Sequence, residues 1–348
     1  YDRGSVRIFV MADNCTDSTA RVARNAGATV YRRNNPFLVG KGYALEELLD
    51  NIAEDYPRGY FDGYFVFDAD NVLDKNYIKE MNRTFCDGYD IITSYRDSKN
   101  YGSNWISAGY ALWFLRESRY LNHARFLLGT SCAVSGTGFF FSRRILEKNG
   151  GWKFHLLTED IEFTVHNIIN GEKVGFCPKA VLYDEQPISF RQSCRQRMRW
   201  AKGYIQVFQK YGVDLLKGAL RGNFSCFDMA MAIMPAVVLT TICVLVNSVM
   251  SVLTLASGGS ILPILLSVGQ SVLNVYLTLF AVGAITTVTE WKNIAASAWK
   301  KIFYAFTFPL FMLTYIPISF AALFAHVEWK PIEHSVSVSC EELWREGA

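Results

Sequence analysis

The pattern of hydrophobic and polar positions changes sharply near Phe227. Upstream, short apolar runs alternate with stretches of helical periodicity. They predict strands at residues 6–11, 29–32, 64–68 and 90–95, and helices at 17–26, 42–54 and 75–85. Such alternation is typical of an α/β sheet with helices on both faces. Ligands bind such sheets beyond the carboxyl ends of the strands, so acidic residues that follow a strand are candidate site residues.

The middle of the chain continues the alternation with longer helices. We expect a helix at 110–126, a strand at 138–141, and a helix at 159–170 that Thr158 opens as its N-cap. Short strands at 173–177 and 180–183 follow. A long amphipathic helix at 190–211 carries many basic residues and is suited to a membrane interface. We expect Arg191, Arg195 and Arg197, on its other faces, to anchor it to lipid headgroups.

Three apolar segments follow, at residues 227–256, 261–288 and 302–325. A membrane-spanning helix needs roughly 20 apolar residues, so each segment is long enough to cross a bilayer. Buried core helices of a large soluble protein are the alternative. Pro309 and Pro317 could kink the third segment or make it re-entrant. The basic cluster before the first segment places everything upstream in the cytoplasm. We therefore expect a multi-pass protein of the plasma membrane with a cytoplasmic catalytic domain.

Composition and charge exclude only a few classes of partner and site. The 348 residues carry a formal net charge of +3, which is too small to indicate a nucleic-acid partner. The eight cysteines contain no CxxC pair, so neither a zinc site nor a disulfide framework is expected. The expected domains are 1–189, an interfacial helix region at 190–226, membrane helices at 227–325 and a tail at 326–348. The abrupt opening strand predicts a fragment that lacks a first strand and an N-terminal helix.

The strongest candidate for a metal site follows the strand at 64–68. Asp68 and Asp70 stand two residues apart in the run Phe-Asp-Ala-Asp-Asn. Carboxylate oxygens suit Mg²⁺ or Mn²⁺, which keep coordination positions for phosphate oxygens. A nucleoside diphosphate leaving group requires such charge neutralisation. The alternative is an ordinary turn rich in Asp and Asn.

Two further signals point to a nucleotide. Asp13 follows the first strand, where a base or ribose contact would lie, although helix capping by its neighbours is the alternative. Lys41, between two glycines, stands at a helix N-terminus, where backbone N–H groups and the helix dipole favour a diphosphate.

Residues that could act on an acceptor occur later in the chain. Glu159 and Asp160 open a helix, and Asp160 is the candidate general base for an attacking hydroxyl. Gln196, Arg199 and Trp200 are spaced to share one face of the long basic helix. Arginine binds phosphate in a bidentate manner, and an indole offers a flat face to a sugar ring.

The order of these motifs, with Asp-Ala-Asp, Thr-Glu-Asp and Gln-Arg-Met-Arg-Trp just before apolar segments, resembles the family-2 glycosyltransferases. The likeness is greatest to their membrane-bound processive branch, which includes cellulose, chitin, hyaluronan and poly-N-acetylglucosamine synthases. It extends over nearly the whole chain. One departure is Ala12, where the family often has an aspartate.

The resemblance implies a GT-A fold with a Rossmann-like, mostly parallel sheet, followed by transmembrane helices. It also implies an inverting, metal-dependent reaction with a UDP-sugar donor. By resemblance, Asp13 contacts uracil, Lys41 and Asp68 contact the nucleotide, Asp70 binds the metal and Asp160 is the base. By the same resemblance, the diphosphate and the acceptor are contacted by Glu159, Gln196, Arg199 and Trp200. Residues 135–138 line the acceptor site.

Three functions are consistent with these residues. The first is a processive polysaccharide synthase that extends a saccharide. The second is a non-processive transferase with a lipid-linked acceptor, which uses the same donor site and base. The third is a transporter with a nucleotide-sensing domain, which would release no UDP.

Overall fold

The first part of the chain forms a small parallel pair of strands. The structure, a computed structural model, describes residues 6–330 except 235 and 259, with backbone alone for 236–244. Strands β1 (Phe9–Asp13) and β2 (Thr29–Arg33) run parallel, with helix α1 (Thr19–Asn25) between them. Helix α2 (Lys41–Asp55) then leads to the main sheet.

The main sheet has five strands. Their spatial order is β3 (Gly63–Val66), β6 (Phe139–Ser142), β5 (Ile91–Ser98), β7 (Val174–Asp184) and β4 (Val72–Leu73). Only β5 and β7 run parallel, and the other three neighbouring pairs are antiparallel. The mixed α/β class is confirmed, but a mostly parallel main sheet is wrong. Apolar runs identify strands without specifying which neighbour or direction they take.

Strand β7 joins two expected strands into one. The expected runs at 173–177 and 180–183, apart from Lys173, are both part of Val174–Asp184. The pairing with β5 shifts between Ser94 and Tyr95, which pair with Cys177 and Val181 respectively. A bulge of this kind absorbs extra residues without ending the strand.

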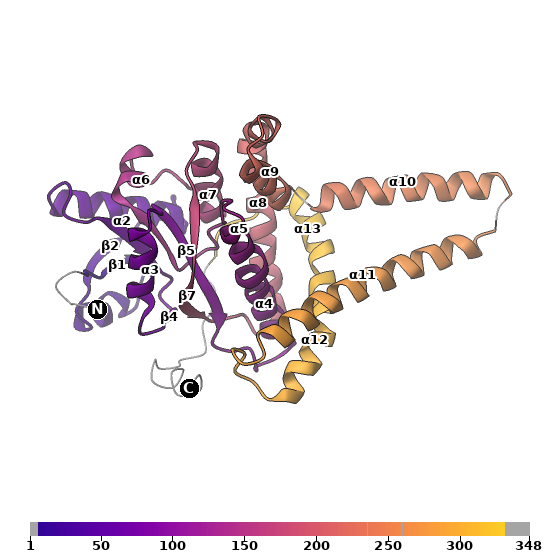
Figure 1. Cartoon of the computed structure of the whole chain (residues 1–348), viewed down its shortest axis with the longest axis horizontal. Helices are drawn as coiled ribbons and strands as arrows, with labels where there is room; N and C mark the ends of the chain where they lie inside the picture. The colour runs from indigo at the N-terminus through magenta and orange to yellow at the C-terminus, as the bar shows by residue number, and fades with distance from the viewer. Residues whose placement is uncertain (1–5, 235, 259, 331–348) are drawn as a thin grey trace.

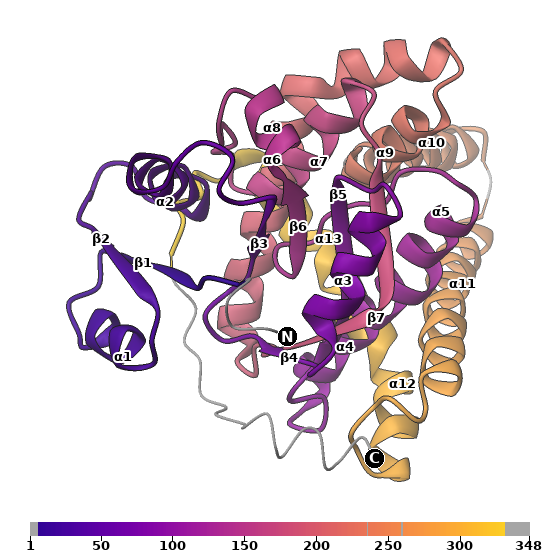
Figure 2. The same cartoon turned by 60° about the vertical axis from the view of Figure 1, so that its left-hand side comes forward.

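Helices cover both faces of the main sheet. Helix α3 (Tyr77–Cys86) lies over β5 and β7 and buries Tyr77 and Met81 against Ile92 and Leu182 (Figure 2). Helix α4 (Trp105–Arg116) covers the other face and continues through a π-helical turn, η2 (Glu117–Asn122), into α5 (His123–Leu127). This helix begins earlier than expected because the side chains of Asn104 and Ser107 form a capping box.

The helices expected at 159–170 and 190–211 are present as α7 (Glu159–Ile169) and the long α8 (Phe190–Leu220). Helix α6 (Arg143–Lys148), which was not expected, lies between β6 and α7. Thr158 does precede α7, but its side chain makes no capping hydrogen bond.

The apolar region is divided differently from the expected three spans. It contains α9 (Phe224–Ile233), α10 (Ala236–Ala256), α11 (Leu262–Thr289), α12 (Ala298–Leu313) and α13 (Tyr315–Phe324). Helices α10 and α11 extend away from the α/β part of the molecule (Figure 1). Within the described residues, two stretches are long and apolar enough to cross a membrane, Leu262–Thr289 and Ala298–Phe324.

Proline explains both interruptions of the expected spans. The expected segment 227–256 is split because α9 ends before Met234, whose helical conformation the following Pro235 disfavours. The expected segment 302–325 breaks at Thr314. The Pro317 ring would meet the carbonyl of Leu313, four residues earlier, and α12 ends there. The break lies near Pro317, whereas Pro309 lies inside α12, and whether the segment is kinked or re-entrant stays a prediction.

Candidate active site

A single glycine links the candidate nucleotide residues to the candidate base. Lys41 at the start of α2 donates hydrogen bonds to Asp68 Oδ1 at 2.5 Å and to the carbonyl oxygen of Gly136 at 2.7 Å. The backbone N–H of Gly136 donates to Asp160 Oδ2 at 2.6 Å. Residues 41, 68, 136 and 160, which are far apart in sequence, thus meet at one place.

The loop that carries Gly136 requires glycine. Gly136 has φ of +74°, a left-handed conformation that side chains rarely adopt. Gly138 has φ of +65°, and a Cβ there would lie 2.0 Å from Leu182 Cδ2. Between them, Thr137 Oγ1 accepts the backbone N–H of Asp68 at 2.9 Å. The loop is therefore attached both to the Asp-Ala-Asp turn and to α7.

The charges in this cluster are strongly coupled. Burial alone would lower the pKa of Lys41, but the negative charges of Asp68, Glu159 and Asp160 raise it. Burial raises the pKa of Glu159, and the charge of Asp160 raises it further. Burial also raises the pKa of Asp160, against the opposing effects of Lys41 and the Gly136 N–H. A buried carboxylate with a raised pKa is well suited to accept a proton near neutral pH.

Buried contacts with α8 fix the start of α7. Glu162, whose side chain is 0% exposed, accepts hydrogen bonds from Lys210 at 2.6 Å, from Tyr211 at 3.2 Å and from the Leu156 N–H at 2.9 Å. Gly203 lets α8 approach closely, since a Cβ there would lie 2.5 Å from the Thr158 side chain. Glu159 and Asp160 are thus held on a packed helix pair.

Glu162→Ala is expected to destabilise the fold by about 2–3 kcal/mol, because it leaves the Leu156 N–H and the Tyr211 hydroxyl without their acceptor, while Lys210 is half exposed. Denaturant unfolding of the full chain in detergent measures the change. Glu147→Ala is the matched control, because Glu147 pairs with Arg58 at the surface, with side chains 43% and 86% exposed. It should cost at most about 1 kcal/mol. Equal effects of the two variants would contradict a structural role for Glu162.

Helix α8 brings Arg199 toward the acids and places Gln196 beside Arg199. The charge of Arg199 lowers the pKa of Glu159 against the dominant effect of burial, which places the guanidinium within electrostatic reach of that carboxylate. Gln196 and Arg199 line one cavity together with residues 325–328. Within the described residues, the buried atoms Gln196 Oε1 and Arg199 Nε have no hydrogen-bond partner, which leaves them available to a ligand.

Trp200 points to a different neighbour. Its ring meets Tyr110 and Phe114 of α4 edge to face, with centroid distances of 5.7 and 6.0 Å. It therefore packs into an aromatic cluster between α8 and α4 and does not line the cavity of Gln196 and Arg199. Its contact with an acceptor sugar stays a prediction.

Arg197 corrects one expectation about the basic helix. Its side chain is 0% exposed and donates to the Phe311 carbonyl at 3.1 Å and to Thr314 Oγ1 at 2.7 Å. Anchoring to lipid headgroups is therefore wrong for Arg197. It binds instead at the break between α12 and α13, where the missing helical hydrogen bonds leave acceptors available.

Asp70 lies in a second cluster, next to the first. Lys99 donates to the Asp70 carbonyl at 2.5 Å and lies 4.0 Å from its carboxylate, which accepts the Glu185 N–H at 3.3 Å. The Asp184 carboxylate lies next to that of Asp70 and interacts with it. Burial alone would raise the pKa of Asp184, but the adjoining Arg96 guanidinium lowers it overall.

Arg96 and Asp184 were not among the site residues expected from the sequence. Arg96 donates to Asp184 and, at 3.0 Å, to the carbonyl of Ser135, so it joins the Asp70 cluster to the Gly136 loop. Two sequence signals could have identified them. Asp184 directly follows the expected strand at 180–183, and Arg96 directly follows the expected strand at 90–95, so both stand at strand ends, as Asp68 does.

The donor set at Asp70 fits a hard cation. Within the described part of the chain, no group of three or more His, Cys, Asp or Glu side chains could hold an ion by itself. Magnesium, however, is often bound by one or two carboxylates together with substrate phosphates. Asp70 and Asp184 are in contact, and two neighbouring carboxylates repel each other unless a proton or a cation is shared.

Asp13 is not brought into either cluster. At the end of β1 it accepts a hydrogen bond from Arg33 at 2.8 Å, and Arg33, only 2% exposed, also donates to Glu47 at 2.8 Å. Among the described residues, no hydrogen bond or ion pair joins Asp13 to Lys41 or Asp68. Its contact with uracil stays a prediction.

The family model described as "Glycosyltransferase like family 2" matches residues 1–203, which include the Lys41, Asp68, Asp70 and Asp160 clusters and the Gln196–Trp200 motif. The chain belongs to this family. The expected family-2 glycosyltransferase is thereby confirmed, and the processive branch stays a prediction.

Individual relatives agree with this family. The probable glycosyltransferase YdaM of Bacillus subtilis is 36% identical over 96 residues, which cover 28% of this chain and 22% of that protein. The beta-monoglucosyldiacylglycerol synthase of Synechocystis sp. is 24% identical over 210 residues, or 59% of this chain and 42% of that enzyme. The chain thus spans less than half the length of these two relatives.

A solved mannosyltransferase has a partly similar structure. The enzyme from Pyrobaculum calidifontis, in complex with GDP-Man and Mn²⁺, aligns with 93% of this chain and 79% of its own, at 15% identity and a TM-score of 0.49. A likeness at this level does not extend to the donor or the metal of this family-2 member.

Proposed function

We propose that this chain is an inverting, metal-dependent glycosyltransferase that moves a sugar from a UDP-sugar to a growing saccharide at the cytoplasmic membrane face. The observation that carries this proposal is the position of Gly136. Its carbonyl accepts from Lys41 and its N–H donates to Asp160, so a cation suited to a diphosphate adjoins a candidate base. Such an arrangement serves both ends of a displacement reaction.

The chemistry follows from these positions. The acceptor hydroxyl oxygen attacks the anomeric carbon and forms the new glycosidic bond, while its proton passes to the Asp160 carboxylate. The bond from that carbon to the diphosphate oxygen breaks, and UDP departs with the electron pair. In this proposal Lys41 and Arg199 supply the positive charge that stabilises the diphosphate. The first turn of α7 and the Gly136 N–H orient Asp160.

A divalent metal would be held by Asp70, with Asp184 beside it, and would neutralise the charge that develops on the diphosphate. Mg²⁺ and Mn²⁺ both suit these oxygen ligands. Asp68 is hydrogen-bonded to Lys41, so its proposed role is to position that lysine against the nucleotide.

Removal of divalent cations with EDTA is expected to abolish sugar transfer, and added Mn²⁺ or Mg²⁺ should restore it. Asp70→Asn should raise the Mn²⁺ concentration for half-maximal activity at least about tenfold, the usual scale for loss of an oriented group at a metal site. A Mn²⁺ titration of UDP release measures this. Asp87→Asn, an exposed position at the end of α3, is the control. Full activity in EDTA would contradict a metal-dependent reaction.

The proposal has two forms, which differ in the acceptor of the sugar. Growth of a polysaccharide is favoured by the resemblance of the motifs to processive synthases. Transfer of one sugar to a lipid is favoured by the similarity to a beta-monoglucosyldiacylglycerol synthase over 59% of the chain. Incubation of full-length protein in membranes with UDP-sugars, followed by mass spectrometry, distinguishes them. A ladder of products indicates processive growth, and a single addition indicates a lipid acceptor. No transfer from any UDP-sugar would contradict both.

The membrane location rests on exposed apolar side chains. Helices α10 and α11 carry many large hydrophobic residues that are about half exposed, including Leu253, Leu265, Leu266 and Val272. Soluble proteins rarely expose contiguous apolar surfaces of this size. We therefore assign 1–189 to the catalytic domain, 190–226 to an interfacial region, 227–325 to membrane helices and 326–348 to a tail. The catalytic domain is placed in the cytoplasm of a multi-pass plasma-membrane protein.

A further inference from the structure

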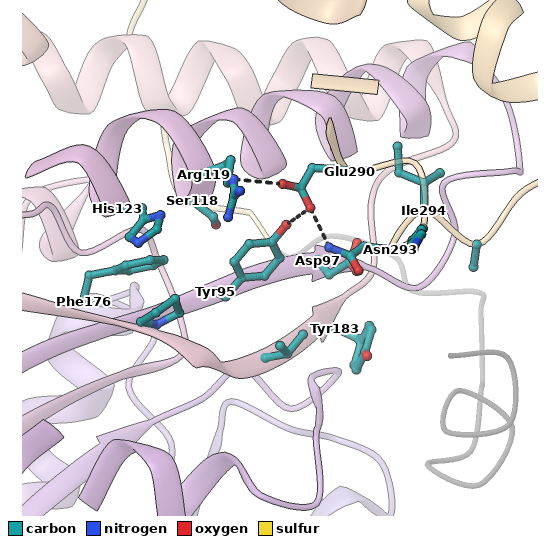
Figure 3. Close-up of a pocket in the computed structure, with 14 residues that line it drawn as sticks. Tyr95, Asp97, Ser118, Arg119, His123, Phe176, Tyr183, Glu290, Asn293 and Ile294 are labelled. Carbon is teal, nitrogen blue, oxygen red and sulfur yellow. Dashed lines mark hydrogen bonds and ion pairs between the residues drawn. The ribbon is translucent and has the colours of Figure 1, made fainter. Parts of the chain in front are cut away.

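A second cavity lies beside β5, with Tyr95 and Asp97 on its wall (Figure 3). Its volume is about 380 Å³, within the range of small-ligand sites. Side chains alternate along a strand, so Tyr95 and Asp97 face this cavity while Arg96 between them binds Asp184. The far wall is the loop between α11 and α12, which includes Glu290 and Lys292.

Glu290 lines one side of the cavity, and both of its carboxylate oxygens have partners. It accepts hydrogen bonds from Tyr95 at 2.7 Å and from Asn293 at 2.6 Å, and it pairs with Arg119 at 3.5 Å (Figure 3). Its side chain is buried. These contacts attach the α11–α12 loop to β5 and η2. This wall of the cavity is therefore held in place by buried polar contacts.

Asp97 is the group that lacks a partner of its own. It is 8% exposed, and in the part of the chain that the structure describes, its one hydrogen bond comes from the neighbouring Ser98 N–H at 2.7 Å. Burial raises the pKa of Asp97 to about 7, and the nearby charge of Glu290 contributes to that rise. A buried carboxylate of this kind is stabilised by a ligand that brings hydrogen-bond donors and positive charge.

The other residues that line the cavity indicate which further groups the ligand carries. Tyr95 and Tyr183 line the same cavity near Asp97 and confine the space beside its carboxylate, while Phe176 lies farther along the strands. Lys292 is exposed on the cavity wall, and no described residue pairs with it. Arg119, which is half exposed and pairs with Glu290, lines the same cavity. The cavity therefore offers a buried acid and, toward solvent, cations.

We propose that this cavity binds a small zwitterion that carries a primary ammonium and a phosphate, the chemistry of phosphoethanolamine. The ammonium would donate to Asp97, and the phosphate would lie between Lys292 and Arg119. Two sources present this chemistry, a phosphatidylethanolamine headgroup and free phosphoethanolamine. The wall loop follows the candidate membrane helix α11 directly, which brings the cavity close to lipid headgroups in the proposed orientation.

Isothermal titration of the full chain in detergent tests the proposal with phosphoethanolamine and phosphocholine. Phosphoethanolamine should bind saturably and at least about tenfold more tightly, because a trimethylated ammonium cannot donate a charge-assisted hydrogen bond. Equal binding of the two ligands by the wild-type protein, or no saturable binding of either, would overturn the site. This comparison requires no variant.

Two substitutions address the two ends of the ligand. Asp97→Asn should weaken phosphoethanolamine at least about tenfold, and Lys292→Gln about threefold, as for an exposed charge pair. Asp87→Asn and Lys79→Gln, at exposed positions on or next to α3, are the matched controls and should bind as the wild type. Unchanged binding by Asp97→Asn would overturn the proposal.

Lipid nanodiscs with equal phosphatidylethanolamine and phosphatidylcholine identify the source. Native mass spectrometry of the released protein should show retained phosphatidylethanolamine, lost in Asp97→Asn, if the ligand is a headgroup. Binding of free phosphoethanolamine without lipid retention identifies the free compound, and either result supports the site. Retention of the two lipids in equal amounts, together with no binding of the free compound, would overturn it.

Discussion

Asp160→Asn is expected to lower kcat for sugar transfer at least about a hundredfold, the usual scale for loss of a general base. Asparagine has the same shape, and its side-chain oxygen can still accept the Gly136 N–H that Asp160 accepts at 2.6 Å. The loop and the Lys41–Asp68 pair should therefore remain in place. The loss should appear in kcat, with little change in KM for the donor. UDP release by the purified full chain at saturating donor measures both.

Asp87→Asn provides the control for Asp160→Asn, because the same change is made at an exposed position at the end of α3. It should leave kcat unchanged. An Asp160→Asn enzyme that turns over as fast as the wild type would show that another group takes the acceptor proton. In that case Glu159, which is adjacent and buried, would be the first alternative to test.

Lys41→Met is expected to move the acid limb of the kcat/KM–pH profile upward by about one pH unit or more. The charge of Lys41 lowers the pKa of both Glu159 and Asp160, against the dominant effect of burial, so its removal raises both pKa values. A base must be deprotonated to act. At a fixed pH on the acid limb, activity should thus fall about tenfold for each pH unit by which the limb moves. Donor KM should rise as well, since a diphosphate contact is lost.

The pH profile distinguishes this effect from simple loss of donor binding. A lost phosphate contact alone raises KM equally at every pH and leaves the position of the limb unchanged. Lys79→Met, on the exposed side of α3, is the matched control and should not change the profile. An acid limb that stays in place in Lys41→Met would mean that Lys41 does not act on the carboxylates of α7.

The sequence predicts a site residue well when the role of that residue depends on its position at the end of a strand or helix. Asp68 follows β3, Lys41 begins α2 and Asp160 lies in the first turn of α7, as expected. These positions follow from local periodicity and capping, which the sequence encodes directly. The link between them, Gly136, was only expected to line the acceptor site. Its part in joining Lys41 to Asp160 depends on contacts between residues 95 and 24 positions apart.

Sheet direction and side-chain direction could not be predicted in the same way. An apolar run at 138–141 identifies β6 but does not show that it enters between β3 and β5 antiparallel to both. On α8, helical spacing groups Gln196, Arg199 and Trp200. Tertiary packing then turns Trp200 toward α4 and buries Arg197 against α12 and α13. A basic residue looks the same in sequence whether it faces lipid or stabilises a broken helix.

A structure of the full chain determined by electron cryomicroscopy with bound UDP and Mn²⁺ tests the central claim most directly. The proposed arrangement places the diphosphate in contact with Lys41 and the ion at Asp70, with Asp160 beside the open position for the sugar. A diphosphate bound away from Lys41, with the ion at carboxylates other than Asp70, would contradict the assignment of this site.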